Sequence, residues 1–420
     1  MQNNYLPKPE LQSKDLKVAF YKIKKFWLIL IIFALLALVI FFAFVRRDTK
    51  QSNSSNVNSS IPSKQSSKNK DYIRLIATGD TIAHDALNAQ AKNSDGSYDY
   101  YQFIKPMQPY FDTSDVNFCN QAVPGGGTKF GISGYPVFNS PLEVARDLNN
   151  LGCNVINTGT NHTFDRGQDV IDAELNYWDT LPGMLAVAGA NRNQKEQDTI
   201  RYFSINGVKF AFLSYSTYSN ITPPNTYGLN MYEAGKAESQ VKDARQNSDI
   251  VIVSMRWGTE YSQDINAEQE RISQKLSDWG SDIIIGHGPH VLEPVKILES
   301  RDGRKTLCWY SLGNFLNAQV PPESLINGLA IMDIDIATKK VKQPSFMPIY
   351  MHYEWTAEQK ANEDLLKRKN FTLVPLDQSK DLLSRSQNNT TIEAQTRRIT
   401  NTLNTYTTVS IVSSEAITRR

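Results

Sequence analysis

Residues 281–291 read SDIIIGHGPHV, a short apolar run that ends in a turn containing glycine, proline and two histidines, His287 and His290. Such a run is typical of a buried strand. The whole chain has only five histidines, so two of them within four residues stand out. In α/β folds, ligands bind at the carboxyl ends of strands, and imidazole is a common metal ligand. The stretch therefore predicts an α/β fold with a site at this strand end.

Polar side chains also follow two other predicted strands. Asp80 comes shortly after the apolar run at 73–78, and Asn161 and His162 follow the run at 153–158. Together with the two histidines of the turn, they offer carboxylate, amide and imidazole groups, which favour a hard or borderline divalent cation. The sequence thus predicts a metal site with nitrogen and oxygen ligands.

Strand-like and helix-like segments alternate through the middle of the chain. Buried strands are expected at 73–78, 116–119, 153–158, 250–254 and 282–285, and helices at 140–151 and 266–279. The first helix opens with Ser140 as its cap and Glu143 at the capping-box position. Asn206-Gly207 lies between two strand-like runs and predicts a hairpin. Helical connections imply parallel pairing, so the expected fold is α/β, with two mixed β-sheets packed together and flanked by helices over residues 72–355.

The N-terminal part predicts a membrane anchor. Residues 26–45 form an uncharged apolar run that is long enough to cross a bilayer as one helix. Lysines concentrate in residues 1–25, which favours an N-terminus inside and the remaining chain outside the cell membrane. A cleaved signal peptide is the alternative, but bulky residues running into Arg46 and Arg47 do not resemble a cleavage site. Residues 46–71 are rich in Ser, Asn and Lys and are expected to form a flexible linker.

Net charge and cysteine content exclude some classes of protein. The formal net charge is +2, which gives no electrostatic reason to expect nucleic acid as a partner. Cys119, Cys153 and Cys308 are widely spaced and odd in number. We therefore expect buried, unreactive thiols rather than a disulfide framework.

Residues 356–420 are more polar and less regular than the preceding part of the chain. They contain one strand-like run at 371–376 and one helix-like segment at 391–403. We expect a C-terminal extension that packs partly on the domain and ends in loose residues.

Seven short blocks resemble the CapA/PgsA family of bacterial capsule and poly-γ-glutamate synthesis proteins. They lie at residues 79–85, 115–124, 133–136, 161–167, 257–261, 286–290 and 310–315, in the order that the family has. Each block alone is a weak signal, but seven in the expected order are specific. The resemblance implies a calcineurin-like metallophosphoesterase fold over most of residues 72–355.

The resemblance also implies roles for individual residues. Asp80, Asn161, His287 and His290 would be metal ligands, and the metal would be Mn, Fe or Zn. His162 would face the substrate as a general acid or as a stabiliser of charge. In such a phosphoesterase, the metal lowers the pKa of a bound water and neutralises charge on the substrate oxygens.

The chain departs from the family pattern where ligands are expected. Ala122 stands where the family has a glutamate, Arg256 where it has a histidine, and Gly288 where it has another histidine. Alanine has no ligand atom, and arginine is a permanent cation without an acceptor. We therefore expect one metal or none, with Arg256 binding an anionic group instead. Asp165 and Glu260 are expected to orient a histidine or the neighbouring loop.

Three functional hypotheses follow. The first is a membrane-anchored, extracytoplasmic protein of capsule or cell-envelope polymer synthesis or export, with polymer synthase or export subunits as partners. The second is a metal-dependent hydrolase that acts on a phosphoester or another envelope substrate. The third is a catalytically degenerate module that binds an anionic polymer. Ala122 and Arg256 count against the second, and the first is preferred.

Overall fold

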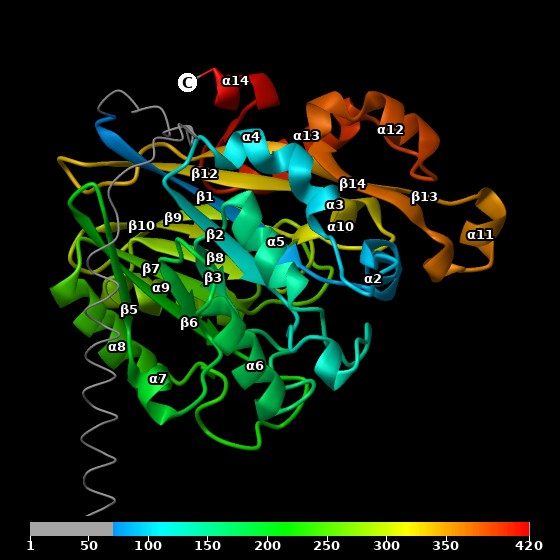
Figure 1. Ribbon diagram of the computed structural model, residues 1–420. Coiled ribbons are helices and arrows are strands. Elements are labelled where there is room, and N and C mark those ends of the chain that lie inside the picture. Colours follow the sequence, from blue (N-terminus) through cyan, green and yellow to red (C-terminus); the bar gives the residue numbers. More distant parts are fainter. Residues whose placement is uncertain (1–69, 420) are drawn as a thin grey trace, which may run out of the picture. The chain divides into compact units, whose positions relative to one another are not determined.

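The computed structural model describes residues 70–419, in which two β-sheets pack face to face with helices outside them (Figure 1). The predicted cytoplasmic segment, the apolar run at 26–45 and nearly all of the linker lie outside the described residues. Within residues 70–419, no helix has the length and apolar character that a membrane span requires.

The first sheet has the order β14-β13-β12-β1-β2-β3-β4, with β11 beside β1 and β15 beside β13. Its strands are β1 (Tyr72–Thr81), β2 (Val116–Gln121), β3 (Val155–Asn157), β4 (Ala186–Ala188), β11 (Asn314–Leu316), β12 (Ile326–Asp335), β13 (Ser345–Glu354), β14 (Lys369–Pro375) and β15 (Ser410–Ile411). Strands β1 to β4 run parallel, whereas β12, β13 and β14 pair antiparallel. The sheet is therefore mixed.

The second sheet has the order β5-β6-β7-β8-β10-β9. Its strands are β5 (Arg201–Ile205), β6 (Val208–Ser216), β7 (Ile250–Arg256), β8 (Ile283–His287), β9 (Val295–Glu299) and β10 (Lys305–Trp309). The four central strands are parallel, and β5 and β9 pair antiparallel at the two edges. This second mixed sheet confirms the predicted arrangement of two mixed sheets flanked by helices.

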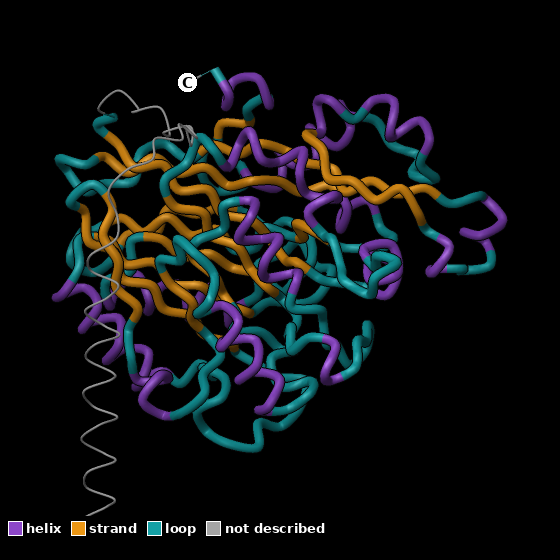
Figure 2. Tube along the Cα trace, viewed as in Figure 1, coloured by secondary structure: helices purple, strands orange, loops and turns teal. Residues whose placement is uncertain are grey.

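Helices and short turns surround both sheets, as the purple segments in Figure 2 show. The α-helices are α2 (Asp85–Ala91), α3 (Tyr101–Ile104), α4 (Gln108–Phe111), α5 (Glu143–Leu151), α6 (Gln168–Trp178), α7 (Gln194–Asp198), α8 (Ala234–Asn247), α9 (Ala267–Trp279), α10 (Pro322–Leu325), α11 (Ala357–Ala361), α12 (Lys380–Arg385), α13 (Ile392–Leu403) and α14 (Ser414–Thr418). The 3-10 turns are η1 (Lys105–Met107), η2 (Thr128–Phe130), η3 (Leu365–Lys367) and η4 (Leu376–Gln378).

The core divides at the second sheet because strand side chains alternate between its two faces. On β7, Ile250 and Ile252 belong to the large core between the sheets, whereas Val251 and Val253 pack against α8 and α9. Aromatic rings close the layer between the sheets, such as Phe118 of β2 and Phe212 of β6, whose centroids lie 6.0 Å apart. Burial on both faces explains why the strands read as continuous apolar runs.

Of the turns and helix caps predicted from the sequence, some are observed and one is not. The hairpin between β5 and β6 turns at Asn206 and Gly207, both with positive φ, as predicted. Helix α9 has the capping box of Asn266 and Gln269. The capping box predicted at Ser140 is wrong. Helix α5 begins only at Glu143, and the buried Ser140 hydroxyl has no hydrogen-bond partner in the described part of the chain.

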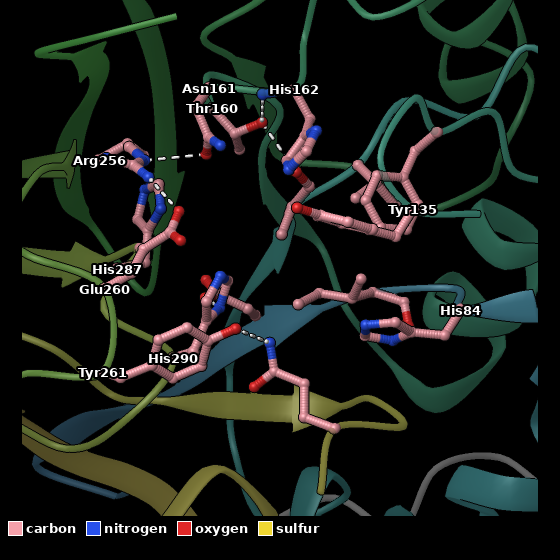
Figure 3. Close-up of a pocket in the computed structure, with 17 residues that line it drawn as sticks. His84, Tyr135, Thr160, Asn161, His162, Arg256, Glu260, Tyr261, His287 and His290 are labelled. Atoms are coloured by element: carbon pink, nitrogen blue, oxygen red, sulfur yellow. Dashed lines mark hydrogen bonds and ion pairs between the residues drawn. The ribbon is translucent and has the colours of Figure 1, made fainter. Parts of the chain in front are cut away.

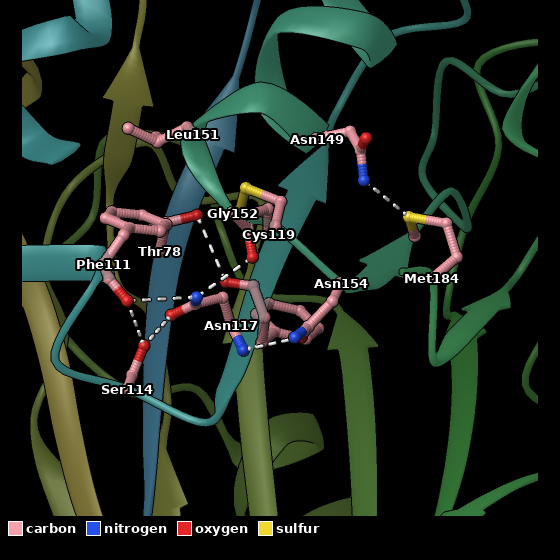
Figure 4. Close-up of a disulfide and its surroundings, with 12 residues drawn as sticks. Thr78, Phe111, Ser114, Asn117, Cys119, Asn149, Leu151, Gly152, Asn154 and Met184 are labelled. Carbon is pink, nitrogen blue, oxygen red and sulfur yellow. Dashed lines mark hydrogen bonds between the residues drawn. A yellow bond between two sulfur atoms is a disulfide. The ribbon is translucent and has the colours of Figure 1, made fainter. Parts of the chain in front are cut away.

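The expectation of three free thiols is also wrong. Cys119 of β2 and Cys153, just before β3, form a disulfide with a Cα–Cα distance of 5.8 Å (Figure 4). The two strands are parallel neighbours, so residues 34 positions apart in sequence become adjacent in space. Only Cys308 agrees with the expectation, as a buried free thiol.

The C-terminal residues are ordered rather than loose. Strand β14 pairs with residues 349–354 of β13, and β15 pairs with Ser345 and Phe346 at the start of β13, on the edge that β12 leaves free. Helix α14 follows and buries Ile417. Residues beyond 356 therefore complete the first sheet and cover its outer face.

Candidate functional site

The carboxyl ends of parallel strands from both sheets meet at one cavity (Figure 3). In the first sheet, Asp80, Asn120 and Asn157 lie side by side in register at the ends of β1, β2 and β3. In the second sheet, Arg256 of β7 lies opposite His287 of β8. The cavity has about 60 Å³ of space for water-sized groups. It brings together the predicted residues, including the loop residues Asn161, His162 and His290.

Asp80 and His290 form a buried ion pair at the end of β1. Asp80 Oδ2 lies 2.7 Å from His290 Nδ1, and Asp80 Oδ1 accepts a 2.5 Å hydrogen bond from Asn120 Nδ2. Burial disfavours both charges, but the hydrogen bond and the attraction between the partners outweigh it. They raise the pKa of His290 and lower the pKa of Asp80. His290 holds this position with a φ of +63°, a conformation that is uncommon for a residue other than glycine.

A chain of polar side chains links this pair to His287. Asn157 Nδ2 donates to Asn120 Oδ1 at 2.7 Å and lies 3.1 Å from His287 Nε2. The hydroxyl of Ser214 contacts the Asn157 oxygen and so fixes the amide with its nitrogen toward the imidazole. Ser254 Oγ lies 3.0 Å from the same Nε2, which therefore accepts hydrogen bonds. Burial lowers the pKa of His287 to about 4, so the imidazole is neutral.

The neutral imidazole of His287 has one nitrogen, Nδ1, without a hydrogen-bond partner among the described residues. Because Nε2 accepts, the proton belongs on Nδ1. That nitrogen is buried and has no hydrogen-bond partner among the described residues. It is the one fully buried side-chain atom of the predicted ligand set that lacks a hydrogen-bond partner within residues 70–419.

Arg256 occupies the wall of the cavity between the two sheets. Its side chain is only 3 % exposed. Its Nε donates to Asn161 Oδ1 at 2.9 Å, and its Nη2 lies 3.2 Å from Glu260 Oε1. The ring of Tyr218 lies 4.4 Å from the guanidinium carbon. Burial lowers the pKa of Arg256, but an arginine stays protonated at any physiological pH.

His162 faces the cavity from the loop after β3. Its Nδ1 lies 2.7 Å from Asp165 Oδ2, which also accepts from the backbone of Phe138 at 2.8 Å. The carboxylate accepts a hydrogen bond from Nδ1–H, which leaves the lone pair of Nε2, 3.4 Å from the amide nitrogen of Asn220, for a ligand. Phe138 packs edge-on against the imidazole at 4.8 Å between centroids. The expectation that Asp165 orients a histidine is confirmed.

His84 lies at the apolar side of the cavity. Burial lowers its pKa to about 3, and its Nδ1 lies 3.1 Å from the backbone nitrogen of Ala318, from which it accepts. This neutral imidazole fixes the loop after β11 and is not available as a proton donor.

The arrangement does not fit a two-metal centre. Within residues 70–419, no group of three or more His, Cys, Asp or Glu side chains is placed to hold a metal ion. The Asn161 oxygen accepts from Arg256, and both Asp80 oxygens are engaged. Ala122 belongs to a small apolar cluster in the cavity wall. The assignment of Asp80, Asn161, His287 and His290 to a single metal stays a prediction.

Gly288 and Arg256 lie close together. Gly288 has a φ of +110°, and a Cβ there would lie 3.0 Å from Arg256 Nε. A histidine at position 288 would therefore be tight against the arginine side chain and equally close to the backbone oxygen of Trp257, which lies 3.0 Å from the same Cβ. The two departures from the family pattern are thus neighbours in the cavity wall.

Sequence reasoning missed the side chains that connect the site. These are Asn157, Ser214, Ser254, Tyr218 and Asn220. Asn157 had a usable signal, since it is a polar residue at the end of an apolar run, as Asp80 is. The two serines had none, because hydroxyls occur in many buried strands.

Curated relatives match the chain over its middle part. It is 32 % identical over 225 residues to the PGA biosynthesis protein CapA of Bacillus subtilis, covering 53 % of this chain and 57 % of the relative. It is 30 % identical over 217 residues to the capsule biosynthesis protein CapA of Bacillus anthracis, covering 46 % and 49 %. The chain thus spans about half the length of the curated relatives that it matches.

The solved structures are less similar in sequence to this chain than the curated relatives are. A phosphatase from Mycoplasma pneumoniae has a TM-score of 0.43 and 14 % identity, over 66 % of this chain and 94 % of that one. A hypothetical protein from Thermus thermophilus has a TM-score of 0.40 and 11 % identity, over 66 % and 98 %. Likeness at this level supports no conclusion about activity.

The family model for the bacterial capsule synthesis protein PGA_cap matches residues 74–319, which include every residue of the cavity described above. This match covers more than half of the 420 residues. The chain therefore belongs to the bacterial capsule synthesis protein PGA_cap family.

Proposed function

We propose that the protein is a membrane-anchored, extracytoplasmic component of capsule or cell-envelope polymer synthesis or export that does not hydrolyse phosphoesters. Membership of the capsule synthesis family supports the polymer role. The names of the two Bacillus relatives point the same way. We infer a polymer of the poly-γ-glutamate type, with synthase or export subunits as partners, because the resemblance to the CapA/PgsA family implies them.

The observation that carries the proposal is the buried guanidinium of Arg256 in the cavity. It engages the Asn161 oxygen that a metal would need, and Ala122 supplies no oxygen to bridge two metals. A hydrolase of the calcineurin-like type, the fold that we infer for the two packed sheets, relies on a metal to generate hydroxide. His162 and Asp165 remain, but an imidazole alone lacks an activated water to act with.

Two observations support the predicted location. The apolar run at 26–45 is long enough to anchor the chain, and the lysines before it favour an N-terminus inside. The Cys119–Cys153 disulfide is typical of proteins that fold in an oxidising compartment.

A metal-dependent phosphoesterase is the second candidate, and one atom favours it. The buried Nδ1 of His287 lacks a partner among the described residues, and it could bind a metal if its proton moved to Nε2, where Ser254 Oγ could accept the hydrogen bond. Asp80 and His290 line the same cavity and could complete a single site if their ion pair opened.

The deciding experiment compares metal content and phosphoesterase activity in the full-length protein. The comparison variant, Ala122→Glu/Arg256→His, restores the two family residues. We expect less than about 0.1 metal ion per chain, by elemental analysis, and no hydrolysis of bis(4-nitrophenyl) phosphate in the natural sequence.

Either of two results would refute the proposal. One is about one tightly held Mn, Fe or Zn per chain that His290→Ala removes. The other is hydrolysis that exceeds that of a His162→Ala variant.

A further inference from the structure

Arg256 is a buried cation with an unusually weak counter-charge. Its side chain is 3 % exposed, but the carboxylate nearest to it, Glu260, is 43 % exposed and 3.2 Å away. Within residues 70–419, no hydrogen bond engages Nη1 of Arg256. Asp80 attracts the guanidinium from within the cavity but gives it no hydrogen bond, since both of its oxygens are bound to other partners. A desolvated charge of this kind is costly unless a well-placed anion satisfies it.

Exposed aromatic side chains surround the mouth of the same cavity. Tyr135 is 78 % exposed and Tyr261 is 55 % exposed, and both line the cavity. Tyr218 is 43 % exposed and stacks on Arg256. In Figure 3, the rings of Tyr135 and Tyr261 lie on opposite sides of the opening.

Each tyrosine packs on a group inside the cavity. The Tyr261 ring lies 5.8 Å from His290, and Tyr135 packs on Phe138, which in turn contacts His162. Val137 and Ile221 are also exposed. Val137 precedes the cavity residue Phe138, and Ile221 follows Asn220, whose amide nitrogen lies 3.1 Å from His162 Nδ1. The three tyrosines, Val137 and Ile221, here called the rim, are more than half of the nine large apolar side chains exposed in the described part of the chain. Apolar exposure concentrated at one opening marks a binding site.

We propose that the cavity binds an oxyanion group, phosphate or carboxylate, through Arg256, that Glu260 occupies this place in the free protein, and that the rim holds the larger molecule carrying the oxyanion. The inference rests on the proposed non-hydrolytic function, because it requires a guanidinium where a metal would otherwise lie. A guanidinium binds either oxyanion with parallel N–H donors, and Nη1 and Nη2 are the donors available here. Nε is not, because Asn161 already accepts from it.

Glu260 is suited to be displaced. It belongs to the loop after β7, and its half-exposed carboxylate reaches Arg256 from the solvent side. An ion pair with one exposed partner contributes little to stability, so an incoming anion replaces it at low cost. The buried partner Asn161 stays in place and keeps the guanidinium oriented.

The experiment is calorimetric titration of the full-length protein with inorganic phosphate, acetate, phenyl phosphate and benzoate. Phosphate against acetate distinguishes the two oxyanions, and the phenyl compounds test the rim. We expect Glu260→Gln to raise affinity for the small anions about two- to fivefold, because it removes a competing charge. Arg256→Gln should lower affinity at least about tenfold.

The rim has its own variant and a matched control. Tyr261→Ala should remove the preference for phenyl phosphate over phosphate and leave phosphate affinity unchanged. Tyr406→Ala is the control, since Tyr406 is 54 % exposed and does not line the cavity. The unfolding temperature of each variant shows whether it is folded.

Three outcomes would overturn the inference. They are absent binding of both small anions, equal affinity in the natural protein and Glu260→Gln, or a Tyr406→Ala effect as large as that of Tyr261→Ala. Release of phenol from phenyl phosphate would instead refute the proposed function, so the two failures are distinguishable.

Discussion

Reduction of the Cys119–Cys153 disulfide should destabilise the protein by a calculable amount. The two cysteines are 34 positions apart, and a bond across such a loop removes conformational entropy from the unfolded chain. The loop-entropy relation gives about 13 cal/mol/K for this length, or about 4 kcal/mol at 25 °C. Both cysteines are fully buried, so this value assumes that the native packing tolerates the two free thiols.

The assay is equilibrium unfolding in guanidinium chloride with and without dithiothreitol. The reductant reaches the bond in the unfolded chain, so the full difference of about 4 kcal/mol appears as a lower midpoint. In thermal unfolding, the same free energy corresponds to a fall of about 5 °C for a domain of about 350 residues.

The control is a Cys119→Ala/Cys153→Ala variant, whose stability should not respond to dithiothreitol. Cys308 remains in this variant and reports any effect of reductant on a free thiol. The reasoning fails if reduction shifts the natural protein by less than about 1 kcal/mol. It also fails if mass analysis of protein purified from an oxidising compartment finds three free thiols.

Three further changes test other parts of the structure. Gly288→Ala should destabilise the protein by about 1–3 kcal/mol in urea unfolding, because it adds strain at positive φ and a contact with Arg256. Gly303→Ala is its control, with positive φ but open space, and an equal loss in both would disprove the contact. Burial raises the pKa of Glu174 to about 8, so its stabilising neutral form is complete below pH 4.5 and is lost as pH rises toward 8. Unfolding midpoints of Glu174→Gln should therefore fall less than those of the natural protein between about pH 5 and pH 8, and parallel falls would contradict this. Deletion of residues 409–420 should cost about 3–6 kcal/mol, since it removes two buried apolar side chains, whereas unchanged thermal unfolding would show that they do not pack.

The strand ends could be predicted because burial leaves a direct trace in the sequence. Strands β7 and β8 are apolar on both faces, and each ends where a polar or charged side chain appears, at Arg256 and His287. A residue at such a boundary lies at the carboxyl end of its strand, where α/β folds place their ligand sites. That is why Asp80 and His287 can be identified without knowledge of strand order, whereas Arg256 is identified only from the resemblance to the family.

The sequence contains no comparable signal for contacts between strands. Cys119 and Cys153 each read as buried, but only the parallel pairing of β2 and β3 makes them neighbours. Ser214 and Asn157 meet because β6 of one sheet faces β3 of the other. Strand β15 has two residues, too few for an alternating pattern, and depends on β13 for its conformation. Which strands pair depends on the whole fold, whereas the burial of a strand can be predicted from its local sequence.

The departures from the family pattern act together and not as isolated losses. Arg256 engages the Asn161 oxygen through Nε, and that same Nε would lie only 3.0 Å from a Cβ at position 288. Replacing Arg256 by histidine alone would free that oxygen but leave the apolar wall at Ala122 and a glycine at 288. A metal would still lack the carboxylate that joins the two halves of the site. The arginine is therefore part of a rebuilt cavity with its own hydrogen bonds, and a positive charge fixed in that cavity favours binding over hydrolysis.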